Sequence, residues 1–549
     1  MSSWNREIVR SRIKDIAGNQ TKRSHDLTTP RSHKIMKLVT ADQMRKLDRT
    51  AIDEFGIPSL GLMERAGKAL ADFICRHFTA SRGTIAVLVG RGNNGGDGLV
   101  TARLLIERGY EVIIFLTSTA VELSPDSRAN WERLALLTPT FIYIKDTTDL
   151  KTHSIAIARC ACIVDALLGT GLSSEVKSPY RDIIDFINSL KMPVVAADIP
   201  SGLSSDTGMP LGGAIRARWT VTFGLPKQGL FTGQGPDYAH DVEIADIGIP
   251  AEAIGRVDTK MHLIDPSLFC DQLKPRDAKS HKGDFGHVVV FAGSEGKLGA
   301  GYLTGMAALR AGSGLVTYAL PDKAFTKFDA RYPEIMAVSI PDRGRGHFHP
   351  DGVADALNVI KDKTVVALGP AIGTHDDTRA FVMELIRRVR LPLVIDADGL
   401  NVLAQNIHAL DYRPTTTILT PHPGEMERLT GQGKKIEERM PSAVKLATSR
   451  RVHVVLKGHQ TIVASPDGSA FINPTGNPAM ASAGMGDALT GIIAGFVSQE
   501  MNPTMAAVAA VYLHGLAGDI AAKQFGERGV VASDVIKCFP EAMRSVIKT

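Results

Sequence analysis

The stretch "TIAVLVGRGNNGGDGLVTARLLIERGYEVIIFLT", residues 84–117, decides the fold class. It begins with a continuous apolar run, passes through a glycine-rich turn into a helical pattern, and ends in a second apolar run. Apolar runs separated by a helix are typical of parallel strands that helices cover on both faces. The turn contains Gly-x-Gly-x-x-Gly as Gly90, Gly92 and Gly95, the spacing of a dinucleotide-binding turn. The stretch therefore predicts a Rossmann-like α/β unit.

The second apolar run argues against an ordinary dehydrogenase. A redox Rossmann unit needs an acidic residue at the end of this strand, where it holds the ribose hydroxyls. The strand ends instead in Thr117, Ser118 and Thr119. For the glycine turn by itself, two alternatives stay open: a site for a phosphate or a hard cation, and a tight turn with an Asn or Asp helix cap.

The same layout continues along the chain. The runs "CIVDALLG", "MPVVAADIP" and "RWTVTFG" predict further strands, and "YRDIIDFINSL" predicts a helix between them. A turn-rich, charged stretch at about 250–280 precedes a second series, which starts at "GHVVVFAGS" and ends in helices rich in Ala and Gly. We therefore expect two α/β domains, residues 36–255 and residues 262–549.

Residues 1–35 differ from the rest, because they carry an excess of Lys and Arg and lack a regular apolar face. We expect a basic, disordered tail there, in which Glu7, Asp15 and Asp26 argue against a transit peptide. Met36 then opens "MKLVTADQMRKLD", a helical pattern behind a predicted Thr40 cap.

Composition narrows the function class. A net charge of +5, without a dense basic stripe, gives no case for a nucleic-acid partner. No stretch reaches the ~18 uninterrupted apolar residues of a membrane span. The 5 cysteines form neither a disulfide framework nor a zinc pattern, and Cys160 and Cys162 fall in a strand-like apolar run. Reduced thiols point to the cytoplasm.

Three predicted strand ends in the first domain carry a carboxylate beside small polar residues: Asn93–Gly98, Asp165–Gly171 and Asp198–Gly202. They resemble the motifs N-N-G-G-D-G, D-A-(L/I)-x-G-T-G and D-(I/V)-P-S-G of the NAD(P)H-hydrate epimerase family. The resemblance implies that the glycine turn binds a damaged dinucleotide as substrate, with Asp198 as the leading acid/base candidate. It implies a potassium ion at Asn94, Asp165 and Ser201. The implied substrate contacts are Asn93, Asn94, Gly95, Gly96, Asp97, Gly169, Thr170, Gly171, Leu172, Ser173, Ser174, Glu175 and Asp198.

In the second domain the strongest motif is "GNPAMASAGMGDALTG", residues 476–491. The backbone amides of Gly484, Gly486 and the following helix point at an anion. Asp487 stands in the first helical turn, where the positive end of the dipole keeps a carboxylate ionised. An ionised Asp beside a phosphate site suits acceptance of a hydroxyl proton during phosphoryl transfer. The alternative is a glycine-rich turn that Asp487 caps.

With "SHKGDFGHVVVFAGS", "GPAIG", "DADGLN" and "TPHPGEMERL", this motif resembles the ADP- or ATP-dependent NAD(P)H-hydrate dehydratase family, which has a ribokinase-like fold. The family loop usually reads G-P-G-L-G, so Ala371 and Ile372 depart from it, and we expect a tighter backbone at Gly373. The resemblance implies phosphorylation of the hydrate, then elimination of phosphate. The implied hydrate contacts are Ala300, Gly373, His422 and Asp487. The implied nucleotide contacts are Lys457, Gly458, His459, Gln460, Thr461 and Gly486.

Both halves treat one metabolite, so the whole chain resembles the bifunctional NAD(P)H-hydrate repair family. That resemblance implies NADHX, NADPHX and ADP or ATP as substrates, K⁺ in the first domain and Mg²⁺ in the second. We also expect a homo-oligomer, and the composition gives no case for a membrane or nucleic-acid partner. An alternative is a ribokinase-like vitamin or sugar kinase with an appended nucleotide-binding domain, although this alternative leaves "SHKGDFGHV" and "TPHPGE" unexplained. A first domain that only senses nucleotides or acts as a scaffold is a third possibility, against which the strand-end carboxylates argue.

Overall fold

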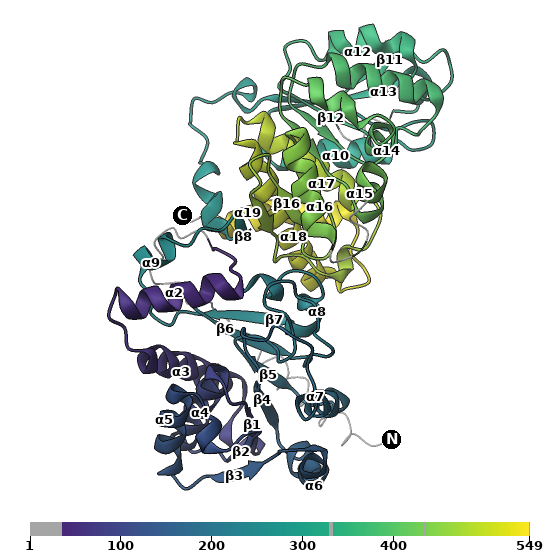
Figure 1. The fold of residues 1–549 in the computed structure, drawn as a ribbon. Coiled ribbons are helices and arrows are strands. Elements are labelled where there is room, and N and C mark those ends of the chain that lie inside the picture. The colour runs from purple at the N-terminus through teal and green to yellow at the C-terminus, as the bar shows by residue number, and fades with distance from the viewer. Residues whose placement is uncertain (1–35, 329–332, 432–434, 436–437, 548–549) are drawn as a thin grey trace, which may run out of the picture. The chain divides into compact units, whose positions relative to one another are not determined.

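The structure, a computed structural model, describes residues 36–328, 333–431, 435 and 438–547 (Figure 1). The tail predicted for residues 1–35 lies outside the described residues. The first helix, α2 (Ala41–Asp53), begins behind Thr40. The Thr40 hydroxyl accepts a hydrogen bond from the Gln43 amide at 3.2 Å, and the Gln43 side chain accepts one from the Thr40 amide at 2.9 Å. This capping box confirms the cap predicted at Thr40.

The first sheet has seven strands, all parallel, in the order β3-β2-β1-β4-β5-β6-β7. The order reverses between β1 and β4, and ligands bind outside the carboxyl ends of strands at such a switch point. The predicted glycine turn follows β1, and Asp165 lies on β4. The strands are β1 (Ile85–Val89), β2 (Val112–Leu116), β3 (Thr140–Tyr143), β4 (Cys162–Ala166), β5 (Val194–Ala197), β6 (Trp219–Phe223) and β7 (Asp241–Ala245).

Helices cover both faces of this sheet, so the predicted three-layer architecture is confirmed. Val87 and Val89 of β1 pack into a core under α3, α4 and α5, whereas Ala86 and Leu88 face the opposite core under α6 and α7 (Figure 1). Cys162 is fully buried in β4, as its apolar run predicted. The helices are α3 (Ser59–His77), α4 (Asn93–Glu107), α5 (Pro125–Ala135), α6 (Thr147–Ala158), α7 (Tyr180–Ser189), α8 (Gly235–Ala239) and α9 (Ala251–Gly255).

The second sheet has ten strands in the order β11-β10-β9-β12-β13-β14-β15-β16-β17-β8. The seven strands from β11 to β15 are parallel, and β16 pairs antiparallel with both β15 and β17. The strands are β8 (Met261–Leu263), β9 (His287–Phe291), β10 (Leu315–Pro321), β11 (Met336–Ile340), β12 (Val365–Leu368), β13 (Leu393–Ile395), β14 (Thr417–Leu419), β15 (His453–Leu456), β16 (Ile462–Ala464) and β17 (Ala470–Ile472).

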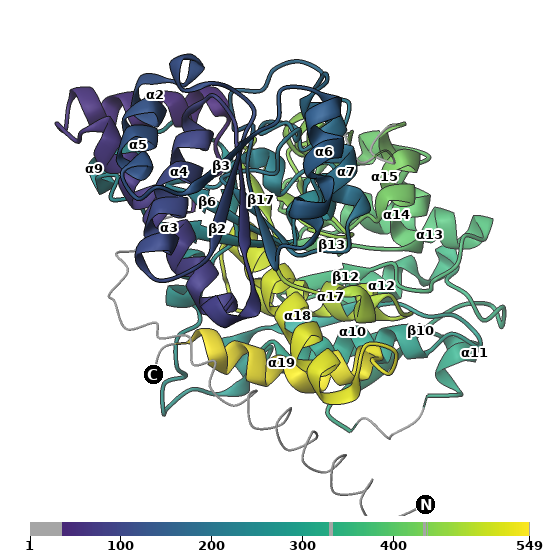
Figure 2. The same ribbon diagram turned by 90° about the horizontal axis from the view of Figure 1, so that it is seen from below.

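This sheet is also covered on both faces, since Val288 and Val290 face one core cluster and Val289 and Phe291 face another. Figure 2 shows α10, α17, α18 and α19 together on one side and α13, α14 and α15 on the other. The helices are α10 (Gly299–Arg310), α11 (Asp322–Phe325), α12 (Val353–Val359), α13 (Asp376–Arg388), α14 (Asp398–Leu403), α15 (Pro423–Thr430), α16 (Arg439–Arg450), α17 (Met485–Ser498), α18 (Pro503–Phe525) and α19 (Ala532–Val546).

Within the described ranges, α18 is the one helix long and apolar enough to cross a membrane. Its most apolar window is 67% buried inside the fold, where Ala507, Val511 and Leu513 join the core of the second sheet. Core helices of this kind pass the same test of length and composition as membrane spans.

Candidate active sites

The glycines that follow β1 allow close backbone packing. A Cβ atom on Gly90 would lie 1.8 Å from the carbonyl oxygen of Leu167, and a Cβ on Gly95 would lie 2.0 Å from the carbonyl oxygen of Gly90. Both distances are far below contact, so the turn requires glycine at these positions. The Gly-x-Gly-x-x-Gly spacing here thus has a structural cause, independent of any redox cofactor.

An oxygen-rich cluster lies between α4 and the carboxyl ends of β4 and β5. The Ser201 hydroxyl donates to Asp165 Oδ1 at 2.5 Å, and the Ser201 amide donates to Asp165 Oδ2 at 2.8 Å. The Asn94 side-chain amide donates to the Leu168 carbonyl at 3.1 Å, while its buried Oδ1 has no hydrogen-bond partner. Burial raises the pKa of Asp165 to about 6, although the Ser201 hydrogen bonds act to lower it. The three predicted potassium ligands therefore lie close together.

Asp198 sits at the end of β5 in the left-handed region, with φ of +64°, which costs a non-glycine residue about 1–2 kcal/mol. Its Oδ1 accepts hydrogen bonds from the Thr222 hydroxyl and the Phe223 amide, both at 3.0 Å, and contacts Lys227 Nζ. The Lys227 side chain is 1% exposed and also donates to the Phe223 carbonyl at 2.9 Å. A strained backbone and a buried ion pair thus fix this carboxylate.

Two more carboxyl groups feel the charges of this ion pair. Burial, with the charge of Asp198, raises the pKa of Asp97 well above its ordinary value, and Lys227 opposes the rise. Burial likewise raises the pKa of Asp48, on α2, to about 6. Neither side chain accepts a hydrogen bond from the described part of the chain. The charges of Lys227 and Asp198 therefore act on two further carboxyl groups, and raised pKa values such as those of Asp48 and Asp97 are typical of acid/base sites.

The other predicted substrate contacts border this site. The Asn93 side chain accepts a hydrogen bond from the Ser124 hydroxyl at 2.8 Å, and a Cβ on Gly169 would lie 3.0 Å from Asn94 Cβ. Gly95 and Gly96 are buried in the first turn of α4, while Gly171 and Ser173–Glu175 are exposed on the loop after β4. Their roles as substrate contacts stay predictions.

Five adjacent strands of the second sheet, β9 and β12–β15, bring the second set of predicted residues to one edge. Asp487 lies in the first turn of α17, whose N-cap is Gly484 with φ of +89°. Burial raises the pKa of Asp487 to about 6, and the neighbouring Asp396 adds to the rise. This direction is opposite to the one expected from the helix terminus alone, because desolvation outweighs the dipole.

Asp396, at the end of β13, anchors this edge. Its Oδ1 accepts a hydrogen bond from Lys457 Nζ at 2.6 Å, and its Oδ2 accepts one from the Thr490 hydroxyl at 2.9 Å. Burial by itself would raise the pKa of Asp396, but the Lys457 ammonium and these hydrogen bonds lower it. Glu425 Oε2 lies 3.8 Å from the same ammonium. Lys457, predicted to hold phosphate, is thus already held by a buried carboxylate.

The loop after β12 has Ala371 and Ile372 where the family usually has Gly and Leu, and this difference affects its backbone. Ala371 occupies the left-handed region with φ of +55°, where the family has glycine, and Ile372 is fully buried. The Gly373 amide donates to Asp398 Oδ2 at 2.9 Å, and Gly373 has φ of +80°. The substitution therefore strains Ala371, and Asp398 fixes the backbone at Gly373.

His422 caps α15. Its Nδ1 accepts hydrogen bonds from the amides of Gly424 at 3.0 Å and Glu425 at 3.4 Å, so the ring proton lies on Nε2. The ring is about half exposed and presents Nε2 at the sheet edge, 3.4 Å from Glu425 Oε1. The residue has a structural role that the sequence did not predict, and its predicted contact with the hydrate stays a prediction.

The segment after β15 has unusual backbone geometry, with φ of +142° at Gly458 and +52° at Gln460. Arg439 of α16 donates to the carbonyls of His459 at 3.1 Å and Lys457 at 3.3 Å. Gly486 lies opposite, since a Cβ on it would be 3.2 Å from Lys457 Nζ. Ala300 lies in the first turn of α10. The structure thus gathers Lys457 and Gly486, and nucleotide binding there stays a prediction.

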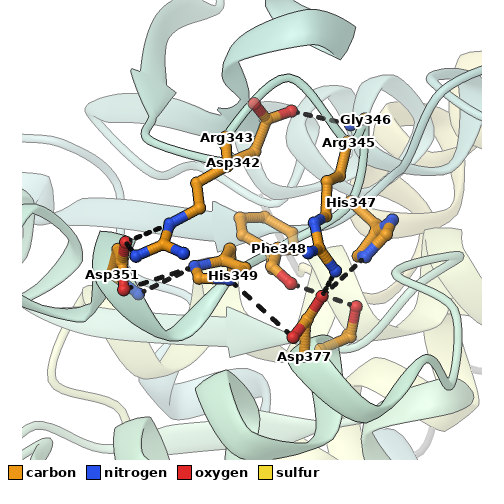
Figure 3. Close-up of polar contacts among 10 residues, drawn as sticks. Asp342, Arg343, Arg345, Gly346, His347, Phe348, His349, Asp351 and Asp377 are labelled. Carbon is orange, nitrogen blue, oxygen red and sulfur yellow. Dashed lines mark hydrogen bonds and ion pairs between the residues drawn. The ribbon is translucent and has the colours of Figure 1, made fainter.

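A polar cluster lies beside the Gly373 loop, between the end of β11 and the start of α13 (Figure 3). Asp377 accepts a hydrogen bond from Arg345 at 2.5 Å and lies 3.4 Å from His347 Nε2 and 3.8 Å from His349 Nε2. The His347 ring stacks on the His375 ring with centroids 4.3 Å apart. Because His375 is two residues beyond Gly373, this stacking contact restrains the end of the Gly373 loop.

Sequence reasoning assigned no role to Lys227, Asp48 or Asp396. Lys227 lies in the turn "GLPKQG" directly after β6, a position at which a buried cation beside strand-end carboxylates could have been suspected. Asp396 is the first Asp of "DADGLN", which served only as a family signature. Asp48 carries no local signal, because α2 reads as an ordinary amphipathic helix.

Comparison with known proteins matches both halves of the chain to known families. The profile of the NAD(P)H-hydrate dehydratase family matches residues 288–541, and that of the YjeF-related protein N-terminus matches residues 59–229. The "Bifunctional NAD(P)H-hydrate repair enzyme Nnr" of Moorella thermoacetica is 41% identical over 93% of this chain and 97% of its own length. The Escherichia coli protein of the same name is 36% identical over 90% and 92%, respectively.

Among solved structures, the ADP/ATP-dependent NAD(P)H-hydrate dehydratase from Bacillus subtilis, co-crystallised with ATP/Mg²⁺, is 30% identical. The similarity covers 52% of this chain and 98% of that one, with a TM-score of 0.45. The relatives match this chain over nearly their full length, across both sheets and both sets of motifs. The chain therefore belongs to the bifunctional NAD(P)H-hydrate repair enzyme family.

Proposed function

We propose that this protein repairs hydrated NAD(P)H at two separate active sites. The first site interconverts the R and S epimers of the hydrate, and the second dehydrates the S epimer to NAD(P)H while it consumes ADP or ATP. One observation carries the proposal: each sheet brings its own ionisable carboxylate, Asp198 or Asp487, to its carboxyl edge. Two chemically different steps on one metabolite require two such sites.

The first site suits proton transfer around a cationic ring. Loss of the hydroxyl as water, with a proton from a carboxylic acid, leaves an iminium cation, and water returning to the opposite face gives its proton to a carboxylate. Asp198 is suited to accept that proton because three donors hold Oδ1 in place. The nucleotide would be held by Asn93–Asp97 and Gly169–Glu175.

The cluster around Ser201 fits a potassium ion. Asn94, whose Oδ1 is buried without a partner, shares the Leu168 carbonyl with Ser201, which also contacts Asp165, and hard cations prefer oxygens of this kind. Among the residues that the structure describes, no group of three or more His, Cys, Asp or Glu could hold a metal ion. The proposed ligands are accordingly a mixed set: one amide, one hydroxyl and one carboxylate. When bound, the ion supplies positive charge beside the nucleotide loops.

The second site suits phosphoryl transfer followed by elimination. Asp487 accepts the proton of the hydrate's hydroxyl, and the oxygen attacks the terminal phosphoryl group of the nucleotide, releasing AMP when ADP is used. The amides at Gly484–Gly486 would stabilise the developing charge, and Lys457–Thr461 would hold the remaining phosphate. Phosphate then leaves as the ring loses a proton, which restores the nicotinamide double bond. Phosphorylation is needed because hydroxide is a poor leaving group.

Magnesium would enter this site on the nucleotide phosphates. Mg²⁺ commonly binds through substrate phosphates and one or two carboxylates, rather than in an all-protein cage. Asp396 is engaged by Lys457 and Thr490, and Glu425 accepts from the His422 amide, so Asp487 is the carboxylate that would help to hold the ion. The ion would supply charge neutralisation during transfer.

The test is to incubate the protein with mixed hydrate epimers, with and without ADP, and to follow recovery of the reduced-nicotinamide absorbance. Full recovery with ADP and none without it is the expected result, because epimerisation feeds the S-specific step. Recovery that stops at the S fraction would contradict the epimerase half. Phosphorylation of vitamins or sugars in preference to the hydrate would favour the kinase alternative.

We also propose a cytoplasmic homo-oligomer. Its free thiols, of which Cys160, Cys162 and Cys538 are buried, suit a reducing compartment. Light scattering of the purified protein would test the oligomeric state, and cell fractionation would test the compartment.

A further inference from the structure

The first site contains more charge than the assigned residues explain. Lys227 is buried to 1% exposure, which for an ammonium is costly unless its surroundings compensate. They do: Nζ contacts Asp198 Oδ1 and donates to the Phe223 carbonyl at 2.9 Å and the Thr222 hydroxyl at 3.3 Å. All three donor positions of the ammonium are thus filled by protein atoms.

The geometry at Asp198 shows what this arrangement achieves. Lys227, the Thr222 hydroxyl and the Phe223 amide all converge on Oδ1, and no donor in the described part of the chain contacts Oδ2. The Asp198 side chain keeps 15% exposure, so one oxygen is locked while the other stays available. A carboxylate that accepts a proton during catalysis needs this separation of a fixed and a free oxygen.

Stability alone does not account for the pair. A buried ion pair adds little net stability over apolar side chains of the same size. Here, moreover, the charge of Lys227 also acts on Asp48 and Asp97, although neither forms an ion pair with it in the described part of the chain. A structural pair would not gather surplus carboxyl groups without hydrogen-bond partners, whereas a site that stabilises a cationic intermediate would.

We propose that Lys227 is a positioning residue for epimerisation, which holds Asp198 by Oδ1 and directs Oδ2 toward the reacting ring carbon. The proposal rests on the proposed epimerase function. Asp48, Asp97 and Asp198 then form the anionic wall that faces the iminium cation. Lys227 does not touch the substrate, and it acts through Asp198.

Two substitutions separate charge from geometry. Lys227→Met keeps the length of the side chain but removes its charge, and Lys227→Arg keeps the charge but cannot place a compact ammonium among the same three acceptors. For Lys227→Met we expect epimerisation kcat to fall about 10²-fold, with a much smaller change in KM. We also expect the low-pH decline of the rate, the acidic limb of the pH profile, to move to higher pH. The limb moves upward because the charge of Lys227 acts to lower the pKa values of Asp48 and Asp97, and its loss lets both rise further.

For Lys227→Arg we expect a fall in kcat of at least about 10-fold with the acidic limb in place, since the charge remains. Lys68→Met, on the exposed face of α3, is the matched control and should leave both activities unchanged. Thermal unfolding of each variant, followed by circular dichroism, reports on folding of the first sheet, and dehydration of the pure S epimer should stay at the wild-type rate because that reaction uses the other sheet.

Wild-type kcat and pH profile in either variant that folds would overturn the proposal. If Lys227→Met does not fold, Lys227→Arg decides by its kcat alone. A wild-type protein that fails to epimerise would instead contradict the proposed function and not the geometry around Lys227, so the two failures are distinguishable.

Discussion

At the scale of single residues, we expect dehydration to depend most on Asp487. In Asp487→Asn the amide keeps the shape but cannot accept the hydroxyl proton, and loss of a general base costs about 10²–10⁴-fold in rate. We expect ADP-dependent dehydration to fall by at least about 10²-fold, while ADP affinity, measured by titration calorimetry, changes far less. Loss of ADP binding would instead make Asp487 a structural cap, and near wild-type turnover would remove it as the base.

The raised pKa of Asp487 sets a pH dependence. The base must be ionised to accept a proton, and burial beside Asp396 raises its pKa to about 6. Dehydration should therefore be constant above about pH 7 and fall about tenfold per pH unit below about pH 6. The pH profile of kcat/KM for the S epimer, at saturating ADP, measures this limb because it reports the pKa before the hydrate binds. A rate that stays constant down to pH 4.5 would mean that the ionised Asp487 is not required.

Asp198 makes a complementary prediction for the other site. Asp198→Asn should abolish epimerisation, because the amide Oδ1 or Nδ2 cannot accept and release a proton. Dehydration of pure S epimer should proceed at the wild-type rate, since Asp487 belongs to a different sheet. With mixed epimers and ADP, absorbance should recover only to the S fraction. Loss of turnover on the pure S epimer would contradict the two-site proposal.

For single residues, the sequence predicts positions in the fold better than it predicts contacts and pKa values. The strand-end positions of Asp165, Asp198 and His422 follow from short motifs beside apolar runs. Lys227 could not be assigned, because its carboxylate partner is 29 positions away and the contact exists only once β5 and β6 are neighbours. The raised pKa of Asp487 was also hidden, since desolvation depends on the packing around a residue and not on its helix position.

At the scale of elements, the loop after β12 stores strain in Ala371. The left-handed region costs a non-glycine residue about 1–2 kcal/mol in the folded state. Glycine removes this strain, but it also increases the entropy of the unfolded chain, which offsets part of the stabilisation. Ala371→Gly should raise the free energy of unfolding by up to about 1 kcal/mol, measured by urea titration. Ala367→Gly in β12, where no strain exists, is the control and should lower stability. A less stable Ala371→Gly protein would show that the left-handed conformation of Ala371 does not reduce the free energy of unfolding.

Buried strands and helices could be predicted from the sequence, whereas exposed or very short strands could not. Strands such as β1, β2 and β4 are continuous apolar runs and could be predicted, as could the helix behind Thr40. The sequence did not reveal β3, whose four residues are partly or fully exposed, because an edge strand needs little apolar character. The antiparallel pair β16 and β17 was missed as well, since three-residue strands lie below what periodicity resolves.

At the scale of the whole molecule, the first described residues are tied to the fold by backbone hydrogen bonds. The Leu38 amide donates to the Met261 carbonyl, and the Leu263 amide donates to the Met36 carbonyl, both at 2.9 Å. A chain that starts at Met36 should therefore keep both activities and melt within about 1–2 °C of the full-length protein. A chain that starts at Ala41 loses the fully buried Leu38 and should be destabilised by about 2 kcal/mol or more. A large loss in the Met36 protein would contradict the prediction that residues 1–35 are dispensable.

The division at residues 255 and 262 remains a prediction, yet the antiparallel bridge between Lys37 and His262 gives it an evolutionary meaning. A stretch whose two ends are hydrogen-bonded neighbours forms a closed cassette, which can be inserted into another gene or excised from it with little loop-closure entropy. His262, however, belongs to β8, the edge strand of the second sheet, so such a cassette would carry one strand of its neighbour with it. Grafting the first half alone onto another protein would therefore require a substitute for that strand.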